Sequence, residues 1–142
     1  MSASLSLTLA NRMDEVPRLV ALLESFGAGA GLSDDLTFRL TVALDEAITN
    51  VIEHAYDDAV SHDIELSVTW DGATLTAVIE DDGRPFDPRE VPRPNVDAPI
   101  EDRKSGGLGV YLVRTFAQNV EYRRAGSRNV LTLTLDEGLK SA

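Results

Sequence analysis

SDDLTFRLTVALDEAITNVIEHAYD, residues 33–57, contains neither glycine nor proline. Ser33 is a candidate N-cap, and Asp34 and Asp35 place negative charge in the first turn, where the helix dipole favours it. Apolar residues recur at helical spacing along one stripe: Leu36, Leu40, Ala43, Leu44, Ala47, Ile48, Val51 and Ala55. The stretch therefore predicts one long helix, about 34–57, with one face against an apolar layer.

Alternating apolar and polar residues predict that this layer is a sheet. The alternating segments are 4–9 (SLSLTL), 64–70 (IELSVTW), 74–80 (TLTAVIE), 119–124 and 129–135. Asp71-Gly72 predicts a tight hairpin, because both turn positions tolerate positive φ, and a second hairpin is expected around Gly126.

The rest of the chain completes the predicted architecture. Asn11 is a candidate cap for a helix over about 12–26, which the glycine run 27–31 would end, and VYLVRTFAQ (110–118) predicts a third helix. Residues 82–106 have no apolar period and predict a long loop. We expect one α+β domain over 1–142, a two-layer α/β sandwich with helices on one face of a mixed, mostly antiparallel sheet.

Composition excludes several classes of function. Twenty-four acidic residues against 13 basic ones give a net charge of −11, which disfavours binding to nucleic acid or anionic membranes. The chain has no cysteine, so disulfides and thiol chemistry are excluded. No window approaches about 18 consecutive apolar residues, and no export signal is visible, so we expect a cytoplasmic protein.

The predicted long helix carries a first polar motif. Glu46 and Asn50 lie four residues apart and His54 another four, so the three side chains project in a row beside the apolar stripe. A carboxylate and an amide carbonyl are hard oxygen donors that suit magnesium. The alternative is a solvated helix edge, which is the commoner reading of an isolated E-x-x-x-N.

Of two further motifs, one follows a predicted strand and the other opens a predicted helix. Asp81-Asp82-Gly83 ends the strand 74–80, and such an acidic side chain can accept a hydrogen bond from an exocyclic amine. The alternative is an ordinary turn. Residues 104–109, KSGGLG, open the third predicted helix, where free N–H groups and the helix dipole favour phosphate. The alternative there is a flexible helix start. Histidines 54 and 62 have no firm metal-ligand spacing and are interpreted as structural.

The order and spacing of the three motifs resemble the N, G1 and G2 boxes of the GHKL ATP-binding superfamily. The local sequence of three segments is similar to that of the anti-sigma-factor serine/threonine kinases of bacterial partner-switching modules. These segments are 45–56 (DEAITNVIEHAY), 81–88 (DDGRPFDP) and 106–112 (GGLGVYL). The resemblance runs from the first strand to the last hairpin and implies a Bergerat-type ATP-binding fold.

The resemblance also implies roles for individual residues. Asn50 would hold magnesium, Glu46 would polarise the attacking hydroxyl, and Asp81 would contact the adenine amine. Gly83 would lie under the base, and Asn129, in place of a frequent threonine, would donate a hydrogen bond. The phosphates would be held, or their charge countered, by Arg103, Lys104, Ser105, Gly106, Gly107, Leu108 and Gly109.

The expected function is therefore an ATP- and Mg²⁺-dependent kinase that phosphorylates a small antagonist protein and sequesters a sigma factor or similar partner. The resemblance further suggests a homodimer and an ATP lid over 88–105. One departure is Pro85, where the superfamily pattern has a glycine, which would stiffen the turn. A nucleotide-gated binding protein without kinase activity is the alternative. An isolated histidine-kinase catalytic domain is disfavoured, because the chain has no room for a phosphoacceptor helix pair.

Overall fold

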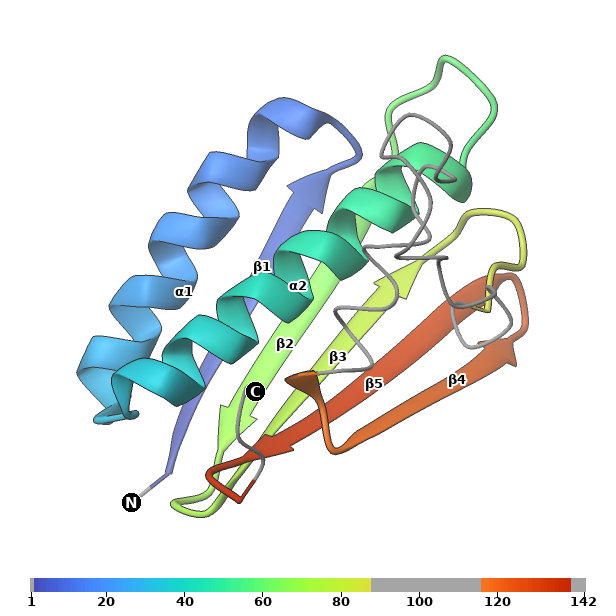
Figure 1. Cartoon of the computed structure of the whole chain (residues 1–142). Helices are drawn as coiled ribbons and strands as arrows, with labels where there is room; N and C mark the ends of the chain where they lie inside the picture. Colours follow the sequence, from blue (N-terminus) through green and yellow to red (C-terminus); the bar gives the residue numbers. More distant parts are fainter. Residues whose placement is uncertain (1, 88–115, 139–142) are drawn as a thin grey trace, which may run out of the picture.

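The computed structural model describes residues 2–87 and 116–138. Its strands are β1 (Ala3–Ala10), β2 (Asp63–Trp70), β3 (Thr74–Asp81), β4 (Asn119–Ala125) and β5 (Arg128–Asp136). Its helices are the 3-10 turn η1 (Met13–Glu15), α1 (Val16–Ala30) and α2 (Asp34–His54). Figure 1 shows α1 and α2 side by side on one face of the sheet, so the predicted two-layer α+β sandwich is confirmed.

The sheet has the strand order β1-β2-β3-β5-β4. Every pairing between the described strands is antiparallel, so this part of the sheet shows no parallel pair, although a mixed sheet was expected. The central pairing sets Asp81, the last residue of β3, opposite Asn129 near the start of β5. Two polar residues from segments 48 positions apart are thereby brought together at one end of the sheet.

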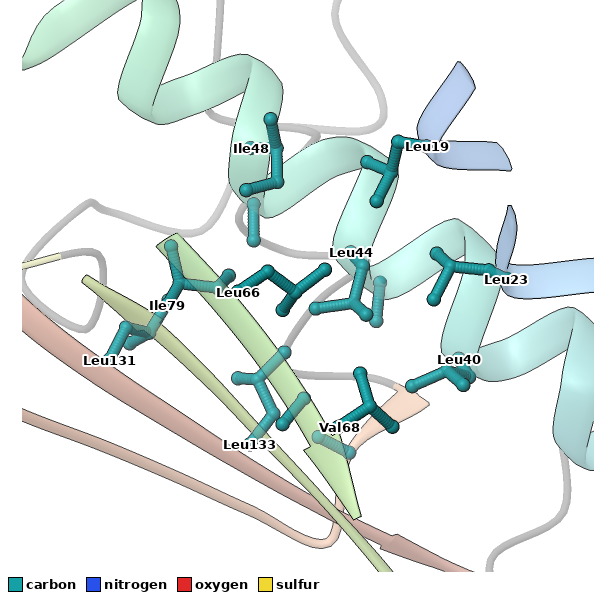
Figure 2. Packing of buried hydrophobic residues seen from close by; sticks show 14 of the residues in the cluster. Leu19, Leu23, Leu40, Leu44, Ile48, Leu66, Val68, Ile79, Leu131 and Leu133 are labelled. Carbon is teal, nitrogen blue, oxygen red and sulfur yellow. The ribbon is translucent and has the colours of Figure 1, made fainter. Parts of the chain in front are cut away.

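The core lies between the helices and the inner face of the sheet. Figure 2 shows leucine and isoleucine side chains of α1 and α2 directed toward those of the strands, among them Leu44, Ile48, Leu66 and Ile79. All eight residues of the predicted apolar stripe of α2 are buried, which confirms that stripe. Removing this much apolar surface from water is the main stabilising contribution to a domain of this size.

Helix α2 begins as predicted and ends earlier. The Ser33 side chain accepts a hydrogen bond from the backbone N–H of Leu36 at 3.0 Å, which confirms the N-cap. The helix ends at His54 and not at 57. Its last carbonyls instead meet Arg84, whose backbone N–H donates to Ala55 O at 2.8 Å and whose Nε donates to His54 O at 2.7 Å. A partner 30 residues away thus ends the helix.

Helix α1 differs from its prediction at both ends. Asn11 caps no helix; its Oδ1 accepts from the backbone N–H of His62 at 2.9 Å. The helix does not end at 26, before the glycine run. It continues to Ala30 and is ended by Gly31, which has φ 75°. Position 27 lies inside the helix and requires glycine, because a Cβ there would stand 2.4 Å from Thr37 Oγ1. The glycine therefore permits the close packing of α1 on α2.

Both predicted hairpins form, the first with a different turn. Of the two predicted turn residues, Asp71 and Gly72, only Gly72 has positive φ, at 97°. Asp71 Oδ1 instead accepts from the backbone N–H groups of Ala73 and Thr74 at 2.8 and 2.7 Å. In the second hairpin Gly126 has φ 62°. The third predicted helix and the loop beyond 87 fall largely outside the described residues. No helix in the part of the chain described here has the length and apolar character needed to cross a membrane.

Candidate functional site

The candidate site lies where the C-terminal end of α2 meets the C-terminal end of β3. The two bonds from Arg84 to His54 O and Ala55 O hold the segment after β3 against the helix terminus, where a cation also interacts favourably with the dipole. Phe86 adds a ring contact with His54, at 5.7 Å between centroids. The junction fixes the first and second predicted motifs relative to each other.

Gly83 is required at this junction by close backbone approach. A Cβ on Gly83 would stand 2.4 Å from Ala55 O, a distance at which the backbone would have to shift. The glycine of the D-x-G motif therefore has a packing reason of its own, in addition to its predicted place under a base. Pro85 is exposed beside it, between residues that are bound to α2 and to β5.

Asn50 is buried, with 3% of its surface exposed. Its Nδ2 donates to the backbone carbonyl of Glu46 at 2.9 Å, which fixes the rotation of the amide. Among residues 2–87 and 116–138, no donor reaches Oδ1. An accessible amide oxygen on a buried side chain that is held in one orientation is a suitable hard ligand for magnesium, so this residue fits the predicted metal.

Glu46 stands one turn before Asn50 on the same helix face and is half-buried. Burial raises the pKa of its carboxyl above the ordinary value, and the negative charges of Asp45 and Glu53 raise it further. A carboxylate with a raised pKa is a better proton acceptor near neutral pH. The place of Glu46 beside Asn50 and its raised pKa therefore fit the role predicted for it from the sequence.

Asp81 is 3% exposed at the end of β3. Its Oδ1 accepts from the backbone N–H of Gly83 and from Asn129 Nδ2, both at 2.9 Å. Burial raises the pKa of the Asp81 carboxyl, while these two bonds and the Arg124 cation act in the opposite direction. No donor within the described residues reaches Oδ2, so this second oxygen is the atom that would accept from a ligand.

Asn129 connects Asp81 to two further residues of the last hairpin, Tyr122 and Arg124. Asn129 Nδ2 donates to Asp81 and to Arg84 O, and its Oδ1 accepts from Tyr122 Oη at 2.5 Å and Arg124 Nη1 at 3.1 Å. Sequence reasoning named Asn129 and missed Tyr122 and Arg124. The available signal was an arginine two residues after an inward-facing tyrosine on a strand, since such residues share a face.

His62 lies outside this network in a second polar cluster. Its Nε2 is 3.0 Å from Asp58 Oδ1, its Nδ1 is 3.2 Å from Asp82 Oδ1, and its ring stacks on Tyr56 at 4.5 Å. Burial alone would lower the pKa of His62, but the hydrogen bonds and charges of Asp82 and Asp58 raise it overall. The cluster ties the loop after α2 to the residue that follows Asp81.

The third predicted motif lies outside the described residues. It comprises Arg103, Lys104, Ser105, Gly106, Gly107, Leu108 and Gly109. The structure thus brings together Glu46, Asn50, Asp81, Gly83 and Asn129 at one end of the sandwich. Two of these residues present an oxygen with no partner in the described part of the protein.

Comparison with known proteins identifies relatives of the chain. The family described as "Histidine kinase-like ATPase domain" matches residues 9–135. The serine/threonine-protein kinase BtrW of Bordetella bronchiseptica is 32% identical over 99 residues, covering 70% of each chain. The serine-protein kinase RsbW of Halalkalibacterium halodurans is 34% identical over 99 residues, which are 67% of this chain and 59% of that kinase.

The fold has a solved counterpart. A crystal structure of RsbU and RsbW domains from Mycobacterium tuberculosis matches with a TM-score of 0.65 and 18% sequence identity. The match covers 94% of this chain and 32% of that one. At this identity the likeness supports the arrangement of helices and strands alone.

Proposed function

The chain belongs to the histidine kinase-like ATPase domain family, within its group of serine/threonine-protein kinases, and we propose that it is an anti-sigma-factor kinase. In this proposal it uses ATP to phosphorylate a serine or threonine of a small antagonist protein and also sequesters a sigma factor or similar partner. The proposal includes a single domain, a homodimer and a cytoplasmic location.

The observation that carries the proposal is the pair of oxygens at the α2–β3 junction. Asp81 Oδ2 is suited to accept from the amine of adenine, because an ionised carboxylate accepts hydrogen bonds only. Asn50 Oδ1 is suited to hold magnesium, which would supply charge neutralisation of the ATP phosphates when bound. Both side chains are buried and held by bonds to the protein, so little freedom is lost on binding.

Glu46 supplies the base in this scheme. The substrate hydroxyl oxygen forms a bond to the γ-phosphorus, the bond from that phosphorus to the β–γ bridging oxygen breaks, and ADP leaves. The hydroxyl proton passes to the Glu46 carboxylate. The raised pKa of that carboxyl suits it to receive the proton. Asp81 and Asn129 take no part in the transfer and hold the base end of the nucleotide.

The test is phosphate transfer from labelled ATP, with Mg²⁺, to an antagonist-like protein encoded by a neighbouring gene, followed by mapping of the modified residue. Glu46→Gln is expected to lower the rate by ~10²–10⁴-fold while ATP affinity stays within a few-fold of the original, since the carboxylate acts mainly in the transition state. Glu24→Gln, the same change at an exposed position of α1, is the matched control and should leave the rate unchanged.

Two results would contradict the proposal. Equal transfer rates for the original protein and Glu46→Gln would remove Glu46 from the reaction. If the original protein transferred no phosphate, yet ATP changed its affinity for the partner, the chain would be a nucleotide-gated binding protein without kinase activity.

A further inference from the structure

Asn129 makes five hydrogen bonds with one amide group. Its Nδ2 donates to Asp81 Oδ1 and Arg84 O, and its Oδ1 accepts from Tyr122 Oη, Arg124 Nη1 and the backbone N–H of Phe86, the last at 3.4 Å. The residue is 3% exposed. Such a saturated amide has a single favourable orientation, provided its partners cannot exchange donor and acceptor roles.

Arg124 and the Phe86 amide remove that exchange. A guanidinium and a backbone N–H only donate, so the atom of Asn129 that faces them must be the carbonyl oxygen. Turning the amide over would set the Nδ2 donor against the donating Arg124 guanidinium and the Oδ1 acceptor against the accepting Asp81 carboxylate. Arg124 Nη1 is itself held, because it also donates to Gly83 O at 2.7 Å. The donor Nδ2 is therefore directed at the Asp81 carboxylate.

This orientation decides what Asp81 can recognise. Burial raises the pKa of the Asp81 carboxyl overall, and the bonds that Oδ1 accepts from Asn129 and Gly83 limit that rise by stabilising the ionised form. In the ionised carboxylate Oδ2 remains an acceptor. An acceptor pairs with the 6-amino group of adenine and repels the 6-oxo group of guanine, which is also an acceptor. A protonated Asp81 could donate to the 6-oxo group and would lose this discrimination.

We propose that Tyr122 and Arg124 are positioning residues that act through Asn129 to hold Asp81 as an acceptor, and so set the preference of the site for a 6-amino purine nucleotide over a 6-oxo one. These three residues form the Tyr122–Arg124–Asn129 relay. The proposal rests on the nucleotide-binding role of Asp81 given above. Among residues 2–87 and 116–138, the other charged or titratable groups that interact with Asp81 are Asp82 and Tyr56.

The first arm of the test needs no nucleotide. The Asp81 carboxyl carbon is titrated by NMR in the original protein, Arg124→Met and Tyr122→Phe. Arg124→Met removes the cation and the shorter of the two bonds that fix the Asn129 amide, leaving the 3.4 Å bond from the Phe86 N–H, so the pKa of Asp81 should rise. Tyr122→Phe should shift it less in the same direction, since it removes one bond and keeps the ring. Gln118→Leu is the matched control, because Gln118 bonds to Asp136 at the opposite end of the same pair of strands and should leave the titration unchanged.

The second arm measures the ratio of ATP to GTP affinity in the same proteins. The ratio should fall by about tenfold in Arg124→Met, which corresponds to about 1.4 kcal/mol, and by about two- to threefold in Tyr122→Phe. Arg124→Lys, which keeps the charge and one donor, should recover part of the loss. A merely structural role would weaken ATP and GTP binding alike and leave the ratio constant.

Some outcomes overturn the relay and others overturn the function on which it rests. An unchanged Asp81 titration in Arg124→Met and Tyr122→Phe contradicts the relay, as does an unchanged affinity ratio. If Arg124→Met fails to fold, Tyr122→Phe decides, because it preserves the packing of the ring. If the original protein binds no ATP, the proposed function fails, and the titration still decides whether the relay holds Asp81.

Discussion

Helix α2 buries a polar side chain near each end, and the two are bonded differently. Near the N-terminal end, Arg39 has no exposed surface and directs its donors at Asp35 Oδ2, Asp136 O and Phe116 O, at 2.9, 2.7 and 3.5 Å. Toward the C-terminal end, Asn50 is almost as deeply buried, but only its Nδ2 has a partner among the described residues.

The difference distinguishes two uses of a buried polar group. Arg39 ties the helix to the carbonyls at the end of β5 and at residue 116, and all three of its nitrogens are engaged. Asn50 and Asp81 each use half of their polar atoms on the protein and present the other half. The first arrangement serves the fold, whereas the second suits the ligand-binding role proposed above. Substitutions at the two ends should therefore separate stability from binding.

The largest effect on stability is expected at Arg39. Arg39→Leu removes the donor to Phe116 O and leaves Asp136 O with only the longer bond from Gln118 Nε2 at 3.3 Å. The free energy of unfolding should therefore fall by about 2–4 kcal/mol. ATP affinity of the folded protein should not change. Urea denaturation and calorimetry measure the two quantities. An unchanged midpoint of unfolding would show that the bonds of Arg39 to Asp136 O and Phe116 O do not stabilise the fold.

The reverse pattern is expected at Asn50. Asn50→Ala should abolish Mg²⁺-dependent ATP binding, a loss of at least about 100-fold or about 2.7 kcal/mol, because no neighbouring oxygen stands at the same height on the helix. The free energy of unfolding should change much less than in Arg39→Leu. Calorimetry with and without Mg²⁺ tests this expectation. Equal Mg²⁺-dependent affinity in Asn50→Ala and the original protein would contradict the assignment.

A smaller effect is expected at Asp81. Asp81→Asn keeps the shape of the side chain but makes one acceptor oxygen a donor nitrogen, so ATP binding should weaken by about 1–3 kcal/mol. Circular dichroism should show that the fold persists. If calorimetry gave the original ATP affinity for Asp81→Asn, Asp81 would not belong to the nucleotide site.

The smallest effect is a pH dependence from the half-exposed His62 cluster beside the junction. Because the pKa of His62 is raised in the folded protein, its contribution to stability is fully present below the ordinary value of about 6.5 and is lost as pH rises through the raised value. The pKa of Asp82 is lowered: burial acts to raise it, but the bonds from Tyr56 and His62 outweigh that. That carboxylate keeps its charge across the same window.

His62→Gln should therefore lower the free energy of unfolding more at about pH 6 than at about pH 8.5, because only the protonated imidazole pairs with both carboxylates. Urea denaturation at the two pH values measures the difference. A constant difference between variant and original protein over this range would show that the charge of His62 contributes nothing.

The sequence predicted the elements whose determinants are local. Ser33 and the apolar stripe of α2 define that helix from its own residues, and the alternating segments define the strands. The sequence did not predict features that depend on distant contacts. Arg84 ends α2 from beyond β3, and Thr37 explains why a glycine lies inside α1.

The candidate site divides in the same way. Asn50 and Asp81 belong to motifs of local spacing and were predicted as site residues from the sequence, and their bonds to the protein follow from that spacing and from strand pairing. Tyr122 and Arg124 were missed because their function arises only when β4 pairs with β5 and β5 pairs with β3. The turn at Gly126 predicts the first of these pairings, but nothing in the few residues around them signals the second.

The measurement that tests the central claim most directly is NMR shift mapping of the ¹⁵N-labelled protein during titration with ATP and Mg²⁺. The account predicts that the largest shifts fall on the Asn50 and Asn129 side-chain amides and on the backbone amide of Gly83, at the C-terminal ends of α2 and β3. The amide resonances of Arg39 and Gln118, at the other end of the sandwich, should hardly shift. Shifts centred on Arg39 and Gln118, or the absence of any shift at saturating ATP, would contradict it.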